Sequence, residues 1–348
     1  MRKAVGERAA PVVVKRRCNS VASHFGTDRF RKGRMNFAAV GWAVLFVGAL
    51  LLLVPDFVEL SYGLRANPEI AAASKAIDMA SDNNAVSEPA AGGEALEAAD
   101  KGASSRPWLE SYNERIRQGE GAPINDPFTF GAADQSFAET GLAGLPVGVL
   151  TVDSMACEAP VYLGSSEQNM LNGAAVVAGT SAPLGESSSN CVIAAHRNMF
   201  FKQIESVQVG DRVDLQTIWG GYVYRVAEIR IIAPSDIKAV TVQEGKDLLT
   251  LATCYPYGSN RQRIIAVCER DEDAGSLSAD AVPSLPRKMT ERAIGRSALS
   301  NIVATIERGR PIDELFIEDC GRLLGRALMV FLFVHVILAA VKRRKTAS

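Results

Sequence analysis

Eight short apolar runs separated by turn-forming residues constrain the fold of this chain more than any other feature. The runs are Gly148–Met155, Pro160–Leu163, Ala174–Ala178, Cys191–Ala195, Arg212–Thr217, Tyr222–Ile232, Asp247–Cys254 and Arg263–Glu269. Gly220-Gly221, between two of the runs, is a hairpin signal. Because no long helical pattern separates them, this stretch predicts a mainly β fold, a closed or nearly closed, antiparallel-rich barrel of eight strands.

The N-terminal part of the chain holds an apolar run that is long enough to cross a membrane. Phe37–Val54 has 18 residues and no charge, close to the length that a spanning helix needs. Residues 1–34 hold ten Lys/Arg against two acids, which keeps that end in the cytoplasm by the positive-inside rule. A cleaved signal peptide is the competing interpretation. We favour an uncleaved anchor, because the run exceeds a usual signal core and no convincing small-residue cleavage site follows it.

A second apolar run predicts a second membrane helix near the C-terminus. Ala327–Val341 has 15 residues, and a start at Leu323 extends the run to 19, with Arg326 reaching the interface. The basic cluster at residues 342–345 follows at once, which favours a span with a cytoplasmic C-terminus. A buried or interfacial amphipathic helix is the alternative. Two spans would leave both termini inside and everything between them outside.

The segments that flank the strand-rich part differ from it in amino-acid composition. Residues 65–105 are rich in Ala, Ser, Glu and Asp with few large apolar residues, which suggests a solvated spacer or a weak helix. Trp108–Arg117 predicts a short helix, stopped by the glycines that follow it. Residues 271–321 are polar and mixed, and a helix is expected at Glu291–Glu307.

Cys254 is the candidate nucleophile of the chain. It closes an apolar, Thr-rich segment at residues 250–254, and a thiolate needs a proton acceptor or a nearby positive charge. The chain has three histidines, of which His24 lies in the basic tail and His335 in the second apolar run. His196 alone remains as a partner in the middle of the chain. Arg263 follows the Cys254 loop and could supply donors and charge to an oxyanion.

Each of these residues also has an ordinary structural explanation. A cysteine on an apolar strand is usually a buried small hydrophobe, a lone histidine is often a satisfied group, and an arginine at a strand start is usually solvated. Arg261 could also share a face with Arg263. The combination of residue types favours catalysis over the separate explanations. The sequence contains no C-x-x-C or H-x-x-x-H pair, so no metal site is expected.

The motif around Cys254 resembles that of the sortases, which are membrane-anchored cysteine transpeptidases of bacterial surfaces. T-L-x-T-C at residues 250–254, an upstream His196-Arg197 and an arginine nine positions after the cysteine carry the resemblance. It implies an eight-stranded sortase-type barrel, in agreement with the strand pattern. It also implies a catalytic set of Cys254, His196 and Arg263, since the spacing selects Arg263 over Arg261.

The resemblance covers about residues 112–269 and points to class C, the pilus-assembling sortases. Tyr112-Asn113 followed by Asp126-Pro127-Phe128 resembles the class C lid, a segment that folds over the active site. The resemblance implies that Asp126 pairs with Arg263 and that Phe128 covers Cys254. An ordinary Asp-Pro turn with one buried ring is the alternative for this segment.

Two features depart from the class C pattern. Asn198 stands where glycine is common, and Phe200-Phe201 resemble class D members, so the assignment between classes C and D stays open. A disulfide between Cys157 and Cys191 is conceivable if their strands adjoin. Cys268 is expected to be buried, and Cys254 must stay free for the chemistry.

As the resemblance implies, Cys254 cleaves an LPXTG-like sorting signal between Thr and Gly, and a pilin lysine amine resolves the thioacyl enzyme during pilus polymerisation. The nearest alternative is a sortase that anchors surface proteins to a peptidoglycan-precursor amine. An alternative of another class is a non-catalytic, membrane-tethered scaffold for surface proteins. The expected partners are LPXTG-bearing surface or pilin proteins and the membrane of a Gram-positive bacterium; no cofactor and no nucleic acid are expected.

These observations divide the chain into eight expected segments. They are a basic cytoplasmic tail (1–34), a transmembrane helix (35–58), an extracellular spacer (59–105), a helix and lid segment (106–145), the barrel (146–271), a polar and helical linker (272–321), a second transmembrane helix (322–341) and a basic cytoplasmic tail (342–348).

Overall fold

The computed structural model describes residues 37–81, 93–129, 137–274, 302–303, 306 and 314–347. The chain divides into two compact units, residues 1–43 and 44–348. All strands and most of the described helical residues belong to the second unit. The expected basic tail at residues 1–34 lies outside the described residues, and so does most of the expected helix at Glu291–Glu307.

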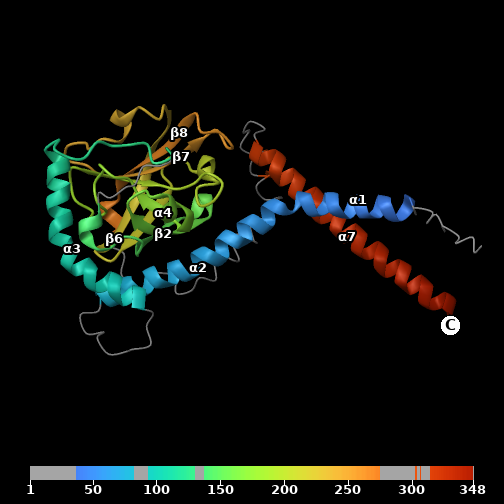
Figure 1. Ribbon diagram of the computed structural model, residues 1–348. Helices are drawn as coiled ribbons and strands as arrows, with labels where there is room; N and C mark the ends of the chain where they lie inside the picture. Colours follow the sequence, from blue (N-terminus) through green and yellow to red (C-terminus); the bar gives the residue numbers. More distant parts are fainter. Residues whose placement is uncertain are drawn as a thin grey trace, which may run out of the picture. The chain divides into compact units, whose positions relative to one another are not determined.

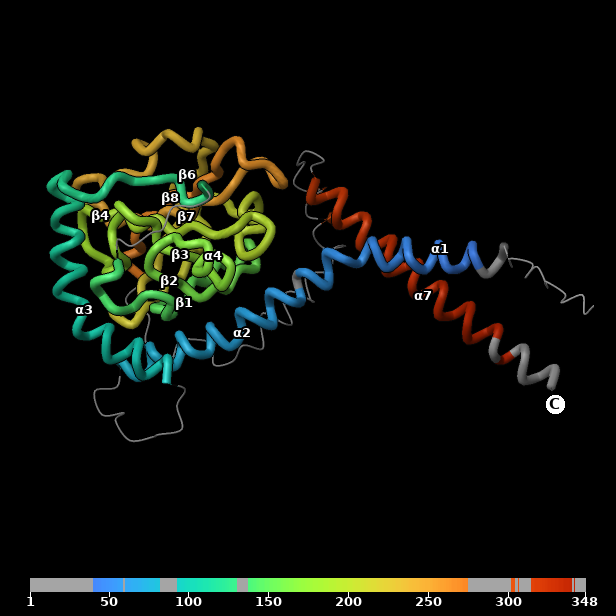
Figure 2. Tube along the Cα trace, viewed as in Figure 1, coloured from blue at the N-terminus to red at the C-terminus, as the bar shows by residue number. Residues whose placement is uncertain are grey.

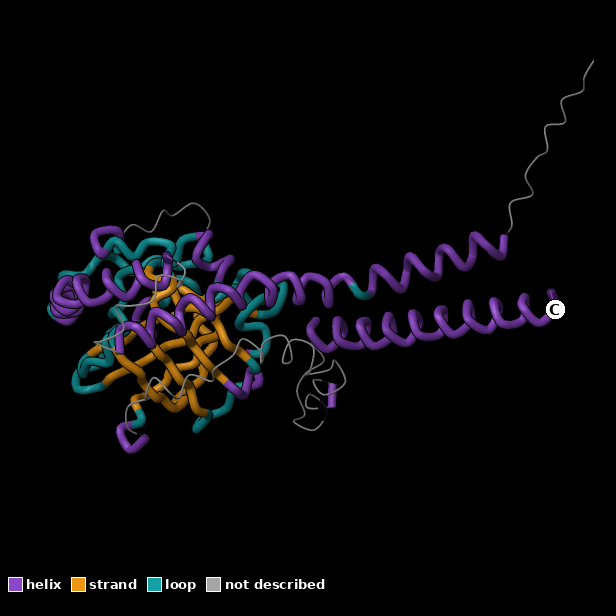
Figure 3. Tube along the Cα trace, turned by 90° about the horizontal axis from the view of Figure 1, so that it is seen from below, coloured by secondary structure: helices purple, strands orange, loops and turns teal. Residues whose placement is uncertain are grey.

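Eight strands close into one barrel in the order β1-β2-β3-β4-β7-β8-β6-β5 (Figure 1, Figure 3). The strands are β1 (Pro146–Val152), β2 (Cys157–Leu163), β3 (Ala174–Val176), β4 (Ser189–Ala194), β5 (Arg212–Thr217), β6 (Gly220–Ile232), β7 (Asp247–Tyr255) and β8 (Gln262–Arg270). The eight strands expected from the apolar runs are thereby confirmed, each with bounds close to those expected.

Two strand pairs in the barrel are parallel, β2 with β3 and β4 with β7. The short helix α4 (Glu167–Asn172) makes the crossover from β2 to β3 (Figure 2). Ser166 caps this helix, because its hydroxyl accepts a hydrogen bond from the Asn169 amide. The parallel pair of β4 and β7 matters most for function, since equal steps along the two strands carry residues to the same end of the barrel.

Strands β4, β7 and β8 are buried on both faces. In β4, Cys191 and Ile193 contribute to the large core cluster, whereas Val192 and Ala194 belong to a second cluster. This second cluster also contains Phe128, which comes from the segment that follows α3. The barrel therefore has an apolar outer surface along β4, β7 and β8 that another part of the chain covers.

The β5–β6 hairpin forms where the paired glycines predicted it, although the glycines do not make the turn. Thr217 pairs with Gly220, so Ile218-Trp219 form the two-residue connection and Gly220-Gly221 open β6. The turn also contacts α3 (Gly93–Arg117), because the indole nitrogen of Trp219 donates to the carbonyl of Gly102 at 2.9 Å. A Cβ on Gly102 would collide with Ile218.

Two long helices contain the described residues of the region 65–105, where we expected a solvated spacer or a weak helix. Helix α2 (Val54–Ser81) packs on β1 and β2 and buries Ala66, Ile70, Ala73 and Ile77 at helical spacing. Helix α3 begins well before the expected Trp108 and ends at the expected Arg117. The helical alternative therefore describes these residues better than the solvated spacer. Small residues let the helices approach the barrel closely, so packing compensates for the few large apolar side chains.

The expectation of two flanking membrane helices is met only in part. Within the described residues, one helix is long and apolar enough to span a membrane, Glu314–Ala339 in α7 (Glu314–Ala347). The N-terminal run forms α1 (Phe37–Leu52), which joins α2 at a bend of 46°. If this bent pair is counted as one span, the described residues contain two candidate spans.

Cys157 and Cys191 do not form the disulfide that the sequence allowed. Both side chains are buried, and no disulfide joins them. The physical reason is topological, because Cys157 begins β2, Cys191 lies in β4, and β3 lies between these strands. Cys268 is fully buried in β8, as expected.

Candidate active site

The register of β4 and β7 brings His196 and Cys254 to the same end of the barrel. Ala194 pairs with Ala252, and each of the two residues lies two positions further along its chain. The connection is reinforced beyond the strands, since the hydroxyl of Thr253 donates to the carbonyl of Ala195 at 2.7 Å. Both His196 and Cys254 are half-buried. The side chains are therefore accessible at the rim of the barrel without being fully solvated.

The antiparallel pair of β7 and β8 adds Arg263. Cys254 and Arg263 are direct cross-strand partners, and residues 256–261 form the loop between the strands. The Arg263 side chain is 5% exposed and donates to the carbonyls of Asn260 and Gln262. Arg261 is exposed and lies just before β8. The three predicted residues Cys254, His196 and Arg263 thus come together, and Arg261 stays outside the group.

The loop between β7 and β8 contributes a contact that the sequence did not predict. The Cys254 thiol donates to the side-chain oxygen of Asn260 at 3.2 Å. The backbone carbonyl of the same asparagine accepts from Arg263. Asn260 therefore contacts both the sulfur and the guanidinium, and its position six residues after the cysteine was the only signal that could have identified it.

A second arginine organises the loop that follows His196. Arg197 is buried and donates to the carbonyls of Phe201 and Lys202 and to the carboxylate of Glu205. These contacts hold residues 197–205 in a compact turn beside His196. The sequence placed Arg197 next to the candidate histidine, but it did not predict this structural role.

The electrostatic surroundings keep both candidate groups neutral. Burial raises the pKa of the Cys254 thiol; Asp126 raises it further, whereas Arg263 and Arg197 lower it. Burial lowers the pKa of His196, with a smaller opposing effect of Glu167. A neutral thiol beside a neutral imidazole is a resting state, because the nucleophile is the thiolate.

The segment that follows α3 lies over this site. Asp126 binds Arg263 through two hydrogen bonds, Nε to Oδ1 at 2.8 Å and Nη2 to Oδ2 at 2.7 Å. Phe128 is 6% exposed, with the Arg263 guanidinium 4.9 Å from its ring centre and the His196 ring 6.2 Å away. Cys254 packs against the cluster that contains Phe128. We call residues 124–129 the lid segment.

Tyr112-Asn113 attach the helix in front of the lid segment to the barrel. The Tyr112 hydroxyl accepts from the Gly179 amide at 3.0 Å, and the Asn113 side chain accepts from the Ala182 amide at 2.7 Å. Both partners lie in the connection between β3 and β4. The end of α3 is therefore fixed on the barrel, and the lid segment begins from a defined point.

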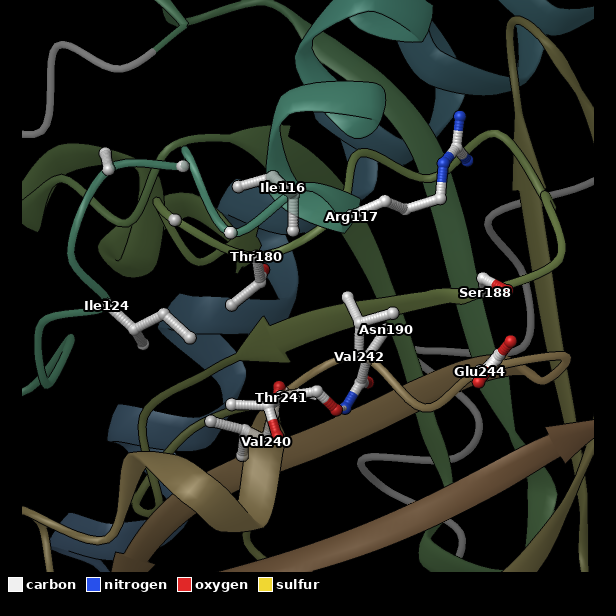
Figure 4. A pocket seen from close by; sticks show the side chains of 14 residues that line it. Ile116, Arg117, Ile124, Thr180, Ser188, Asn190, Val240, Thr241, Val242 and Glu244 are labelled. Atoms are coloured by element: carbon white, nitrogen blue, oxygen red, sulfur yellow. Dashed lines mark hydrogen bonds between the residues drawn. The ribbon is translucent and has the colours of Figure 1, made fainter.

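Little space remains beneath the lid segment. A cavity of about 50 Å³ lies between the lid segment and the outer surface of β4, β7 and β8. A roomier cavity of about 620 Å³ lies at the other end of β4, and its lining includes Ile116, Arg117, Val240 and Thr241 (Figure 4). Neither Cys254 nor His196 lines it, and Ile124 of the lid segment borders both cavities. The lid segment therefore leaves little free space over this surface of the barrel.

Among the described residues, no group of three or more His, Cys, Asp or Glu side chains is arranged to hold a metal ion. The chemistry that the site offers is that of a thiol, an imidazole and a guanidinium. These groups can perform nucleophilic attack, proton transfer and stabilisation of an oxyanion.

Comparisons with known proteins agree on one family. The model of the Sortase domain matches residues 150–271. Sortase D of Bacillus subtilis (strain 168) is 26% identical over 119 residues, which make up 34% of this chain and 58% of that protein. Sortase A of Bacillus anthracis is 31% identical over 123 residues, which make up 34% of this chain and 57% of that protein. The chain spans a little over half the length of these curated relatives.

Solved structures include similar chains. A crystal structure of Streptococcus agalactiae sortase C1 is 27% identical, with a TM-score of 0.46, and the match covers 58% of this chain and 97% of that chain.

Proposed function

Residues 150–271 form a sortase domain, and from this premise we propose that the chain is a membrane-anchored cysteine transpeptidase. One observation carries the proposal: strand register brings Cys254, His196 and Arg263 to one end of the barrel. No other described histidine lies near a cysteine on the barrel, since His335 belongs to α7.

The first half of the proposed reaction forms a thioacyl enzyme. The lid segment leaves, which frees the Arg263 guanidinium from Asp126. The Cys254 thiol gives its proton to His196, and the thiolate that results attacks the Thr carbonyl of an LPXTG-like signal. Arg263 donates to the oxyanion that forms. When the C–N bond breaks, the imidazolium of His196 gives its proton to the leaving Gly amine.

The second half transfers the acyl group to an amine. A neutral lysine amine attacks the thioester, His196 accepts its proton, and the C–S bond breaks to release the Cys254 thiolate. The thiolate then takes the proton from His196, which restores the neutral thiol and the neutral imidazole. The products are an amide between the two proteins and the regenerated enzyme. Proton and sulfur return to their starting state, so the cycle needs no cofactor.

We propose a pilin lysine as the acceptor and pilus polymerisation as the result. The support is the lid segment, in which Asp126-Pro127-Phe128 resembles the class C pattern and Asp126 binds Arg263 in the way this resemblance implied. A peptidoglycan-precursor amine is the second candidate acceptor. The apolar part of α7 supports a location at the cell membrane, with the barrel outside.

Substitution of the three central residues tests the activity. Cys254→Ala and His196→Ala should abolish cleavage of an LPXTG-type peptide. Arg263→Ala should reduce the rate by about 10²–10³, the usual cost of losing one oxyanion donor. Peptide cleavage and mass spectrometry of the thioacyl enzyme measure these outcomes.

Matched controls use the other arginine and cysteines of the barrel. Arg261→Ala should retain cleavage, and Cys157→Ala, Cys191→Ala and Cys268→Ala should retain the thioacyl enzyme. Acylation of any cysteine other than Cys254 would contradict the assignment. Polymer assembly by the Cys254→Ala variant would favour the scaffold over the enzyme.

A further inference from the structure

The first turns of α7 contact both loops that carry the candidate catalytic residues. One carboxylate oxygen of Glu318 lies 2.7 Å from the Lys202 ammonium, in the loop after His196. The other oxygen accepts from the Tyr257 hydroxyl at 2.9 Å, in the loop after Cys254. A single side chain of α7 therefore bridges the two loops.

The two loops also touch each other at this point. The Arg197 guanidinium lies 5.7 Å from the centre of the Tyr257 ring, and Arg197 donates to the carbonyl of Lys202. Arg197 follows His196 directly, and Tyr257 is three residues from Cys254. A shift of Glu318 would therefore be transmitted to the segments beside both catalytic side chains.

The contact of Glu318 with Lys202 is buried, so the Lys202 charge depends on its partner. Lys202 is 8% exposed, and the side chain of Glu318 is 19% exposed. A buried ammonium group is costly unless it is paired. Gly258 also lies close to α7: its φ of +73° favours glycine, and the nearest atoms to its ideal Cβ position belong to the Glu314 carboxylate. The loop and the helix thus fit closely at two successive turns of α7.

Helix α7 is itself held at the junction of α1 and α2. Arg326 binds Asp56 through two hydrogen bonds of 2.9 and 3.0 Å, and Arg322 lies between Asp56 and Glu318. A Cβ on Gly325 would lie 2.9 Å from Leu52, so the helices approach closely there. A continuous series of charged contacts runs from the start of α2 to the two catalytic loops.

We propose that Glu318 is a positioning residue, through which α7 sets the placement of the His196 loop relative to the Cys254 loop. The inference rests on the proposed transpeptidase function and adds the helix to the active-site scaffold. Glu318 touches neither substrate nor sulfur; it acts through Lys202 and Tyr257. Because misplacement of catalytic groups by about 1 Å can cost about 10² in rate, loss of the bridge should lower turnover.

The test uses the full chain in lipid nanodiscs, with Asp126→Ala/Phe128→Ala as a lid-open parent so that peptide turnover is measurable. Glu318→Gln removes the charge at nearly constant shape. Lys202→Met and Tyr257→Phe remove its two partners separately. Glu269→Gln is the matched control, because Glu269 forms an exposed pair with Lys246 at 2.5 Å and contacts neither loop. Active sites are counted by labelling of Cys254, and kcat is expressed per labelled site.

Glu318→Gln should lower kcat on the order of tenfold or more and leave KM nearly unchanged, because α7 does not line the groove beneath the lid segment. Adding Tyr257→Phe to Glu318→Gln should lower kcat little further, since both changes break one bridge. A merely structural role would reduce the number of labelled sites and not kcat per site. Equal kcat in Glu318→Gln and Glu269→Gln would overturn the proposal. Absence of thioacyl enzyme in the parent would overturn the proposed function and, with it, this role of Glu318.

Discussion

At the scale of single residues, the candidate site is built so that its nucleophile is held back. The pKa of the Cys254 thiol is raised by burial and by Asp126 and is lowered by Arg263 and Arg197. Asp126 acts twice, since it opposes thiolate formation and occupies the guanidinium donors. In the proposed reaction, the lid segment would control access to the thiol, its charge and the oxyanion donor together.

Removal of the lid contacts should release this control. In the Asp126→Ala/Phe128→Ala double variant the pKa of Cys254 should fall, because one acid that raises it is gone and Arg263 is unopposed. Labelling of Cys254 by a thiol reagent should become faster and its pH profile should move to lower pH. Cleavage of short peptides should rise, because substrate no longer competes with a tethered occupant of the groove.

The stability of the barrel should change little in this variant. The Asp126–Arg263 pair is buried, with side chains 15% and 6% exposed, so loss of Asp126 alone would leave a charge without its partner. Removing Phe128 as well opens Arg263 to water and relieves that cost.

Asp273→Ala, a change of an exposed acid, is the control for the labelling experiment. Identical labelling rates in wild type and double variant would show that this segment does not shield the thiol.

At the scale of elements, strands were easier to predict than helices. The apolar runs of β4, β7 and β8 are continuous because both faces of these strands are buried. The length of helices α2 and α3 was not predicted, because many of the residues they bury are small, as Ala73, Ala98 and Gly102 show. Their helical state depends on contacts with the barrel, which local composition does not reveal.

The same distinction applies to the candidate site. Cys254 could be named because it closes an apolar strand, and His196 because the other two histidines lie in the terminal segments. The family resemblance selected Arg263 over Arg261. The Asp126–Arg263 pair is separated by 137 residues, and it could be named only through the resemblance of the lid. No sequence pattern pointed to Glu318, because its partner Lys202 is 116 residues away and the contact depends on where α7 packs.

The start of β7 provides a prediction about stability and pH. Burial raises the pKa of Asp247 to about 6, while hydrogen bonds from Tyr224 and Ser189 and the charge of Arg270 lower it and Glu186 raises it. A folded-state pKa above the unfolded value means that the protonated form stabilises the fold. This contribution is present below about pH 4 and is lost as pH rises through about 6.

Asp247→Asn should remove this pH dependence, because asparagine is neutral and can still accept from Tyr224. Its free energy of unfolding should exceed that of wild type at pH 8, by up to about 3 kcal/mol, and the two should converge near pH 4. Urea unfolding at both values measures the difference, with Asp273→Asn as an exposed control. A difference that is the same at both pH values would contradict the assigned titration.

At the scale of the whole molecule, the contacts of Asp56 relate the two apolar helices. Asp56 follows α1 by four residues and pairs with Arg326 near the start of the apolar part of α7. If both helices cross the membrane, this pair places the end of the first span beside the beginning of the second. Both spans then leave the membrane on the face where the barrel lies.

This arrangement predicts the topology of the chain. The reporters are Ser104→Cys on the exposed side of α3 and Ser348→Cys at the C-terminus, each in a background with Cys18, Cys254 and Cys320 changed to serine. The remaining Cys157, Cys191 and Cys268 are buried and should not react in the folded protein.

On intact cells, an impermeant maleimide should label the Ser104→Cys variant, because the barrel is outside. It should label Ser348→Cys only after the membrane is permeabilised, because the basic residues after the second span are retained in the cytoplasm. Labelling of Ser348→Cys on intact cells would mean that α7 does not cross the membrane in this direction, and that Arg326 binds Asp56 in a helix lying outside the bilayer.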